Sequence, residues 1–292
     1  MSQEPRKHHY LPEFHSSWWA ASDRRLVRYT KPTANKIDIK RVYPSEVGWQ
    51  RDLYAFADES GRQTQILESG FLKRIDDKAA RVLRKLNENY DTPLRPDESG
   101  PWTVYIQSLL VRSPIAIALF KAKAHTIYDQ ILPDIRQAYG SLRSPTDPVT
   151  LEEYEAIRGP VDITDMAMRL FPKTILNLNI ANFIHDMCWA YRTVPTGQHT
   201  LLLSDDPVVR TNGLKTVDGH LAVPLSPNRL FLATWKASTM QKFDQIKTRD
   251  IVKMVNHSTA CGARQFVIAD GFSQTSFIER RFGTLLRPSI VG

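Results

Sequence analysis

Strong helical periodicity is confined to the middle of the chain. From Ile66 to Tyr90 apolar residues recur every three or four positions with Lys, Arg and Asp between them, which predicts one amphipathic helix. A proline-containing loop is expected next, at 93–101. Two further helical blocks are predicted at 103–139 and 164–191. The first is expected to break near its two prolines, because proline removes a helical hydrogen bond; these prolines are Pro114 and Pro133.

The two ends of the chain carry β-type patterns. Alternation of Ile with Asp and Lys predicts a strand from Lys36 to Val42. Near the C-terminus a helix is expected between Thr248 as N-cap and Gly262 just past its end. Short apolar runs separated by turn sequences predict further strands at 201–203, 208–209, 221–223, 230–233 and 266–269.

These patterns together predict an α+β fold with a helical central region between β-containing ends, formed as a single unit over residues 1–292. The mainly helical part is expected at 62–195 and the mixed part at 198–292. We expect the N-terminal segment to pack beside the strand that ends at Ser204.

The stretch from Thr200 to Val209 combines a buried strand with acidic residues. Its three consecutive leucines predict a strand covered on both faces, and Asp205, Asp206 and Pro207 follow at once. Two carboxylates at a strand exit can hold Mg²⁺ or Mn²⁺, which prefer oxygen ligands. The alternative is turn chemistry, since Asp and Pro are common turn residues.

Charge adds a hypothesis about partners. The formal net charge is +8, and residues 1–50 hold nine Lys or Arg against five Asp or Glu, while residues 229–292 hold ten against four. Basic chain ends that meet in space would suit nucleic acid; a solvated basic surface is the alternative. The sequence does not set the oligomeric state.

Three features favour a cytoplasmic location without a membrane partner. The N-terminus lacks the apolar core of a signal peptide, and the longest apolar run, Ile115 to Phe120, is far shorter than a membrane span. Only two cysteines occur, Cys188 and Cys261, and we expect both to be free thiols in apolar, helical surroundings.

Four further residues are candidates for chemistry or binding. His8 and His9 can serve as base, metal ligand or phosphate contact, or they can be a hydrogen-bonded pair near the terminus. Arg112, among apolar neighbours, can grip an anion or form a buried salt bridge. Asn256 can contact a ligand or satisfy a nearby backbone group.

Several segments in order resemble a bacterial family, domain of unknown function 4238, marked by an N-terminal His-Tyr-Val/Leu-Pro-x-Phe motif. That motif is His9 to Phe14 here; the other similar segments are Gln107 to Pro114, Ser204 to Val208, Pro224 to Pro227 and Asn256 to Ala260. The chain departs from the family after Phe14, where His15-Ser16-Ser17 replaces Tyr-Leu-Arg. The resemblance implies one fold unit over nearly the whole chain and names no activity.

The sequence leaves three functional hypotheses. In the first, Asp205, Asp206 and His9 form a metal-dependent phosphodiesterase or nuclease site. The second is a nucleic-acid-binding or regulatory protein without catalysis, and the third is an interaction protein whose motifs only pack. Phosphate-binding glycine loops, the Gly-x-Ser-x-Gly elbow and the His-Glu-x-x-His motif are absent from the sequence.

Overall fold

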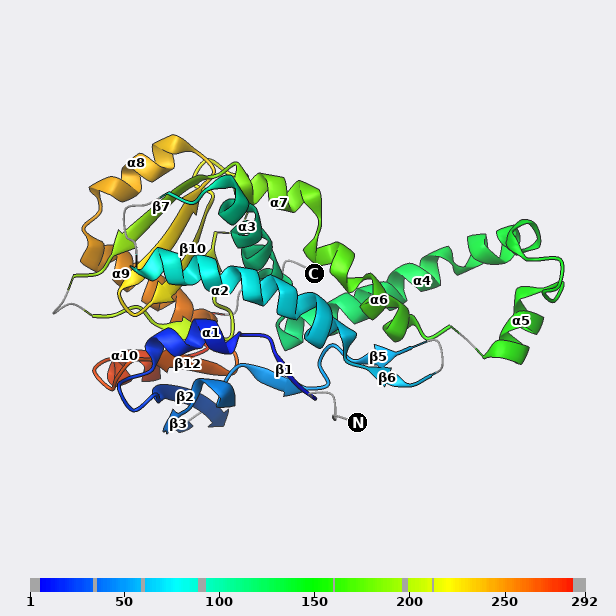
Figure 1. Ribbon diagram of the computed structural model, residues 1–292, viewed down its shortest axis with the longest axis horizontal. Helices are drawn as coiled ribbons and strands as arrows, with labels where there is room; N and C mark the ends of the chain where they lie inside the picture. The colour runs from blue at the N-terminus through cyan, green and yellow to red at the C-terminus, as the bar shows by residue number, and fades with distance from the viewer. Residues whose placement is uncertain are drawn as a thin grey trace.

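A four-stranded antiparallel sheet lies between two layers of helices (Figure 1). Successive side chains of a strand point to opposite faces, and here both faces are buried. Leu221 and Val223 of one strand join the core with α2 (Lys73–Glu88) and α3 (Pro96–Val111), whereas Ala222 between them packs toward α8 (Ala237–Gln245) and α9 (Thr248–Gly262). The strands, in spatial order, are β7 (Cys188–Thr193), β11 (Arg229–Thr234), β10 (His220–Ser226) and β9 (Val209–Arg210).

A second four-stranded antiparallel sheet joins the two ends of the chain. The C-terminal strand β12 (Phe266–Ala269) pairs with β2 (Leu26–Thr33) on one side and with β8 (Leu203–Ser204) on the other. β3 (Lys36–Val42) completes the sheet beside β2 and spans the residues that alternation predicts. Lys31 Nζ also donates to the carbonyl of Phe282 at 3.2 Å. The basic ends of the sequence therefore do meet in space.

Short elements complete the structure, which describes residues 6–33, 36–58, 61–88, 93–159, 161–195, 199–211 and 213–285. Two small antiparallel pairs are β1 (Lys7–His9) with β4 (Trp49–Arg51) and β5 (Phe56–Ala57) with β6 (Gln63–Thr64). The helices outside the central block are α1 (Glu13–Ser16), η1 (Ser17–Trp19), η2 (Pro44–Glu46), α8 (Ala237–Gln245), α9 (Thr248–Gly262) and α10 (Thr275–Glu279).

The helical centre is confirmed, with different boundaries. The predicted helix from Ile66 to Tyr90 opens with a π-helical turn and then continues as an α-helix to Glu88; Tyr90 lies outside the described residues. The last predicted block ends early, because its final residues form β7. The central helices are η3 (Leu67–Leu72), α2 (Lys73–Glu88), α3 (Pro96–Val111), α4 (Pro114–Leu142), α5 (Leu151–Arg158), α6 (Ile163–Ile175) and α7 (Leu178–His185).

Prolines account for two of the incorrect predictions. The expected loop at 93–101 is partly helix, since Pro96 occupies the first helical position, where the missing N–H costs nothing. Pro133 does not break α4. It deprives the carbonyl of Asp129 of its helical partner, but Asp129 is exposed, so water can replace that bond. The expected break at Pro114 is confirmed: α3 ends at Val111 and α4 begins at Pro114.

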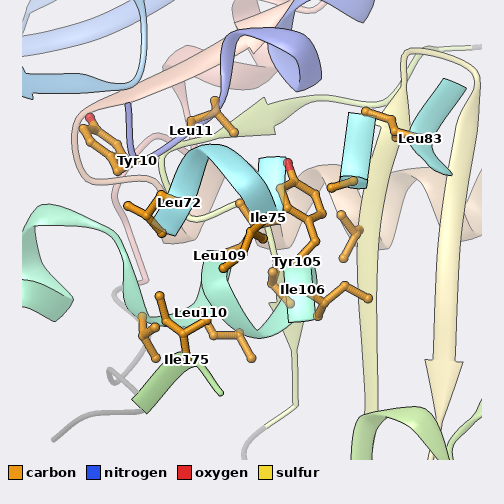
Figure 2. Packing of buried hydrophobic residues seen from close by; sticks show 14 of the residues in the cluster. Tyr10, Leu11, Leu72, Ile75, Leu83, Tyr105, Ile106, Leu109, Leu110 and Ile175 are labelled. Atoms are coloured by element: carbon orange, nitrogen blue, oxygen red, sulfur yellow. The ribbon is translucent and has the colours of Figure 1, made fainter. Parts of the chain in front are cut away.

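The main core lies where α2 and α3 pack together under the N-terminal segment. Figure 2 shows Leu72 and Ile75 beside Leu109 of α3, with Leu11 close by. Trp102 of α3 meets Phe231 of β11 edge to face, with ring centroids 5.8 Å apart, so the same core reaches the central sheet.

The three leucines at 201–203 are all buried, yet each enters a different core cluster. Leu203 joins the α2–α3 core, Leu201 the core under α8 and α9, and Leu202 the core beneath β12 and α10. The regular strand is only Leu203–Ser204, shorter than predicted. The N-terminal segment packs beside it as expected, since Trp19 Nε1 donates to the carbonyl of Leu201 at 2.7 Å.

Two further expectations concern cysteines and membrane spans. Both cysteines are free thiols; Cys261 is buried in α9, whereas Cys188 lies in β7 and not in a helix. Among the described residues no single helix has both the length and the apolar character to cross a membrane. Only α3 and α4 together, bent by 76° between them, meet that requirement.

We predict that Trp19→Phe destabilises the protein by about 1–3 kcal/mol, because it leaves the buried Leu201 carbonyl without its indole donor. Urea denaturation of both proteins measures the difference. Trp49→Phe is the control: Trp49 is 41% exposed, and we expect a change within about 0.5 kcal/mol. Equal effects of the two substitutions would contradict the assigned role of Trp19.

Candidate functional site

His8 is a structural residue at the N-terminal strand pair. It is fully buried in β1, and its Nδ1 accepts a hydrogen bond from the backbone N–H of Tyr54 at 2.9 Å. Its ring stacks on the Tyr54 ring at 5.5 Å between centroids. This matches the hydrogen-bonded alternative for the histidine pair.

His9 points toward a different set of groups from its neighbour. Its backbone N–H donates to Glu68 Oε1 at 3.0 Å. Burial lowers the pKa of the His9 imidazole, and the nearby charges of Lys7 and Arg112 lower it further, so the ring is neutral near pH 7. Its Nε2 is buried without a hydrogen-bond partner in the described part of the chain.

Arg112 lies at the end of α3 and is completely buried. Its Nη1 donates to Asp76 Oδ1 at 2.9 Å, and its guanidinium carbon lies 5.4 Å from the centre of the Tyr105 ring. The Tyr54 hydroxyl donates to its backbone carbonyl at 2.8 Å. The buried salt bridge considered for Arg112 is therefore present. Within the described residues, however, Nε and Nη2 of Arg112 have no hydrogen-bond partner.

Two acidic residues near Arg112 were not among the sequence candidates. Glu68 lies on η3 and Asp76 on α2, and burial raises the pKa of both while Arg112 opposes that shift. For Glu68 the pKa reaches about 7. A signal did exist in the sequence: Glu68, Leu72 and Asp76 follow one another at intervals of four, so both acids lie on the apolar stripe.

His15 is a further buried histidine that the sequence reasoning missed. Burial lowers its pKa to about 4, so the ring is neutral. Nε2 lies 2.7 Å from the carbonyl of Pro224 and must carry the proton. Nδ1 therefore accepts from the Tyr105 hydroxyl at 2.8 Å. This chain links the N-terminal segment, α3 and β10 around the buried arginine.

The predicted acidic pair is divided between two structural roles. Asp205 is buried and accepts the backbone N–H groups of Arg264 at 3.0 Å and Phe266 at 3.3 Å, at the start of β12. Burial raises its pKa to about 6 against the effect of those bonds. Asp206 points toward Arg210, with 3.7 Å between Oδ1 and Nη1. Within the described ranges no group of three or more His, Cys, Asp or Glu side chains is arranged to hold a metal ion.

Asn256 lies on α9 at the wall of a pocket. Its carboxamide accepts from the backbone N–H of Leu202 at 2.9 Å and donates to the Thr200 carbonyl at 2.8 Å and to Gln274 Oε1 at 2.9 Å. The backbone role considered for Asn256 is therefore confirmed. The candidate residues thus separate: His9 and Arg112 share one buried polar cluster, and Asn256 belongs to the pocket.

The pocket between α9 and α10 has a volume of about 650 Å³. We call it the α9–α10 pocket; its lining residues are His199, Val252, Lys253, Met254, Asn256, His257, Ser273, Gln274, Ser276, Phe277, Arg280 and Arg281. This lining includes three permanent cations and two histidines but no Asp or Glu.

Arg281 is held in place at the pocket. Its guanidinium carbon lies 4.2 Å from the centre of the Phe277 ring, and its Nε donates to His257 Nδ1 at 3.2 Å. Nδ1 of His257 is thus an acceptor, and in the neutral ring the proton is on Nε2. The side chain of Phe272, on the segment that leads into α10, is 57% exposed. A guanidinium held in place, with an exposed aromatic residue close to it in the chain, is suited to an anionic ligand that has a flat group.

The fold and these sites define an α+β protein with a helical middle and a basic pocket beside its C-terminal helices. The chain belongs to the family described as Protein of unknown function (DUF4238), whose model matches residues 7–271. No curated protein and no solved structure matches it. The family resemblance is thereby confirmed, and α10 with Arg280 and Arg281 lies beyond the matched residues.

We predict that Glu68→Gln becomes more stabilising as pH rises from 5 to 8. A carboxyl group whose folded pKa lies above its unfolded value binds its proton more tightly when folded. The unaltered protein therefore loses stability as pH rises from about 4.5 to about 7. Gln keeps an acceptor for the His9 N–H but carries no charge. The difference between pH 5 and pH 8 should be on the order of 2 kcal/mol in urea denaturation. A difference independent of pH would contradict the assignment.

We predict that Asp205→Ala lowers the free energy of unfolding by about 2–3 kcal/mol, because the backbone N–H groups of Arg264 and Phe266, at the start of β12, lose a charged acceptor. Asp205→Asn should cost less than Asp205→Ala, since the carboxamide oxygen keeps one acceptor for the N–H groups of Arg264 and Phe266, although the second carboxylate oxygen, 3.2 Å from the Arg264 N–H, is replaced by a donor. Thermal denaturation in the presence and absence of Mg²⁺ or Mn²⁺ provides the measurement. An ion-dependent stabilisation that Asp206→Asn abolishes would instead indicate a metal site there.

Proposed function

We propose that this protein binds nucleic acid without hydrolysing it, through the α9–α10 pocket. The observation that carries the proposal is a pocket of about 650 Å³ whose lining includes Lys253, Arg280 and Arg281 and no acidic residue. Phosphate groups are the abundant cellular ligands that such a field attracts, and phosphate contacts supply most of non-specific nucleic-acid affinity.

Single-stranded nucleic acid suits this surface better than a duplex. A single strand can bend its phosphates into a concave pocket and leave a base free to stack on an aromatic ring. Phe272 is an exposed aromatic residue that directly precedes the lining residues Ser273 and Gln274 in the chain. Arg281, held over Phe277, offers a guanidinium at a fixed position, so little side-chain entropy is lost on binding.

Binding is favoured over metal-assisted hydrolysis because of the environments of the proposed ligands. Both oxygens of Asp205 accept the backbone N–H of Arg264, and Asp206 faces Arg210, so neither carboxylate is oriented toward an open cation position. His9 lies with Glu68 and Arg112, in a different buried cluster. The donors present therefore do not fit a Mg²⁺ or Mn²⁺ centre.

The role belongs to this chain and does not extend automatically to its family. The α9 wall of the pocket, with Lys253, Asn256 and His257, falls within the matched residues 7–271. The opposite wall, with Arg280 and Arg281, falls outside them. A family member without these arginines would keep the fold and lose much of the positive field.

We predict that the double variant Arg280→Gln/Arg281→Gln weakens binding of a fluorescent oligothymidine by roughly 10-fold at low salt. The dependence of affinity on salt should also become shallower, because two phosphate contacts are lost. Fluorescence anisotropy over a salt series measures both effects. Lys73→Gln/Arg84→Gln, which removes two exposed charges from α2, is the charge-matched control and should change affinity by less than about 2-fold.

Three results would count against the proposal. The first is that the unaltered protein binds no oligonucleotide. The second is that the control variant weakens binding as much as the pocket variant does. Cleavage of the oligonucleotide with added Mg²⁺ or Mn²⁺ would favour the hydrolase hypothesis instead.

A further inference from the structure

Helix α4 leaves the body of the protein and, with α5, forms a projecting arm (Figure 1). In α4 only Ala116 and Ile117, near its first turn, are buried. From residue 118 to residue 159 no residue is buried. Helices in proteins owe most of their stability to packing of an apolar face, and an arm of this length without buried residues leaves part of its surface without a packing partner.

An apolar stripe runs along the outer half of α4. Tyr128, Ile131, Ile135, Ala138 and Leu142 follow one another at intervals of three, four, three and four, the spacing of the seam positions of a coiled coil. Ile131 is 44% exposed and Leu142 is 74% exposed. Tyr128, Ile135 and Ala138 are half-buried, so the stripe is only partly covered and a second helix can cover the remainder.

The side of α4 next to this stripe is already occupied by α5. The rings of Tyr139 and Tyr154 meet edge to face at 6.1 Å, and Arg136 Nε lies 3.2 Å from Glu152 Oε1. α6 covers the inner half of α4, where Phe120 and Phe171 lie 5.6 Å apart. The open part of the stripe is therefore confined to the outer turns.

We propose that the arm is a self-association surface, in which α4 of one copy pairs antiparallel with α4 of a second copy. The stripe is complementary to itself in this direction. With the two-fold axis between Ile131 and Ile135, Tyr128 lies opposite Ala138 of the second copy and Ile131 opposite Ile135 of the second copy. Two Ile–Ile layers then lie at the centre, and a layer that pairs the large Tyr128 with the small Ala138 lies on each side of them, which fills space without overpacking.

The shape of the molecule favours the same direction. The arm projects from one end of the body (Figure 1), so antiparallel arms overlap while the two bodies remain at opposite ends. Parallel arms would force the two bodies side by side. In this arrangement Pro133 lies on the side of α4 that faces away from the second copy. Its missing N–H therefore does not disturb the contact.

The charge of Asp134 distinguishes the antiparallel pair from a parallel one. In the antiparallel pair Asp134 flanks the seam beside the two-fold axis and faces Asp134 of the second copy. Like charges across a seam oppose association, so removing this charge should strengthen the dimer. In a parallel pair the same residue would face Tyr139, and removing its charge would relieve no repulsion.

Sedimentation velocity of the full chain from ~1 to ~100 µM tests the proposal. The unaltered protein should show a concentration-dependent dimer. Ile131→Glu should raise the dissociation constant by ~10-fold or more, whereas Asp134→Asn should lower it. Leu178→Glu, at a residue of α7 that is 72% exposed, is the control and should leave the dimer unchanged. Thermal denaturation checks that each variant folds.

A protein that stays monomeric at every concentration would overturn the proposal. This holds also if the arm then proves to bind a different protein. A dimer that Ile131→Glu leaves intact would overturn it as well. Weakening by Asp134→Asn would exclude the antiparallel register.

Discussion

The carboxamide of Asn256 holds the backbone on which the three core clusters of this protein converge. Residues 200–202 lie outside any regular strand, so their polar groups need partners from side chains, because buried backbone groups without hydrogen bonds are costly. Asn256 binds the Leu202 N–H and the Thr200 carbonyl, and Trp19 binds the Leu201 carbonyl. With this backbone satisfied, each leucine can enter a different cluster. Gln274 Nε2 also donates to the Thr200 carbonyl, and the Leu201 N–H donates to the carbonyl of Pro227, so the meeting point of both sheets and the helical centre is held by a small set of hydrogen bonds in which Asn256 has the central place.

Unlike the hydrogen bonds of Asn256, the buried cluster around Arg112 has an energetic cost. Burying an arginine and two carboxyl groups is costly, and the Asp76 salt bridge offsets only part of that cost. What the cluster contributes is register: His15, Tyr105 and Pro224 can form their chain of hydrogen bonds only when the N-terminal segment, α3 and β10 are aligned. A polar core of this kind specifies one alignment of the three segments more strictly than apolar packing alone, because displaced polar partners leave buried groups without hydrogen bonds.

Local patterns predicted the elements far better than they predicted the site. Strict alternation located β3, and the apolar run with its following turn located β12 at residues 266–269. The sequence could not show that Leu201 and Leu202 lie outside the strand ladder, because that depends on Asn256, more than fifty positions away. It could not separate Asp205 from Asp206 either, since their different environments are created by β12 and Arg210. Glu68 and Asp76 are different, because they interrupt an apolar helical stripe. Their burial could have been predicted from the sequence and was not.

The pairing of β12 with β2 and β8 has a consequence for the growing chain. β12 lies between two strands that precede it by many residues, and within the described part of the chain no strand follows it. Until it emerges from the ribosome, β2 and β8 expose unpaired edges, which are templates for aggregation. The nascent protein can form its helical centre early, from local contacts, but it cannot close this sheet until Ala269 has been synthesised. Synthesis of this protein therefore leaves a long interval in which a chaperone would have two open strand edges to protect.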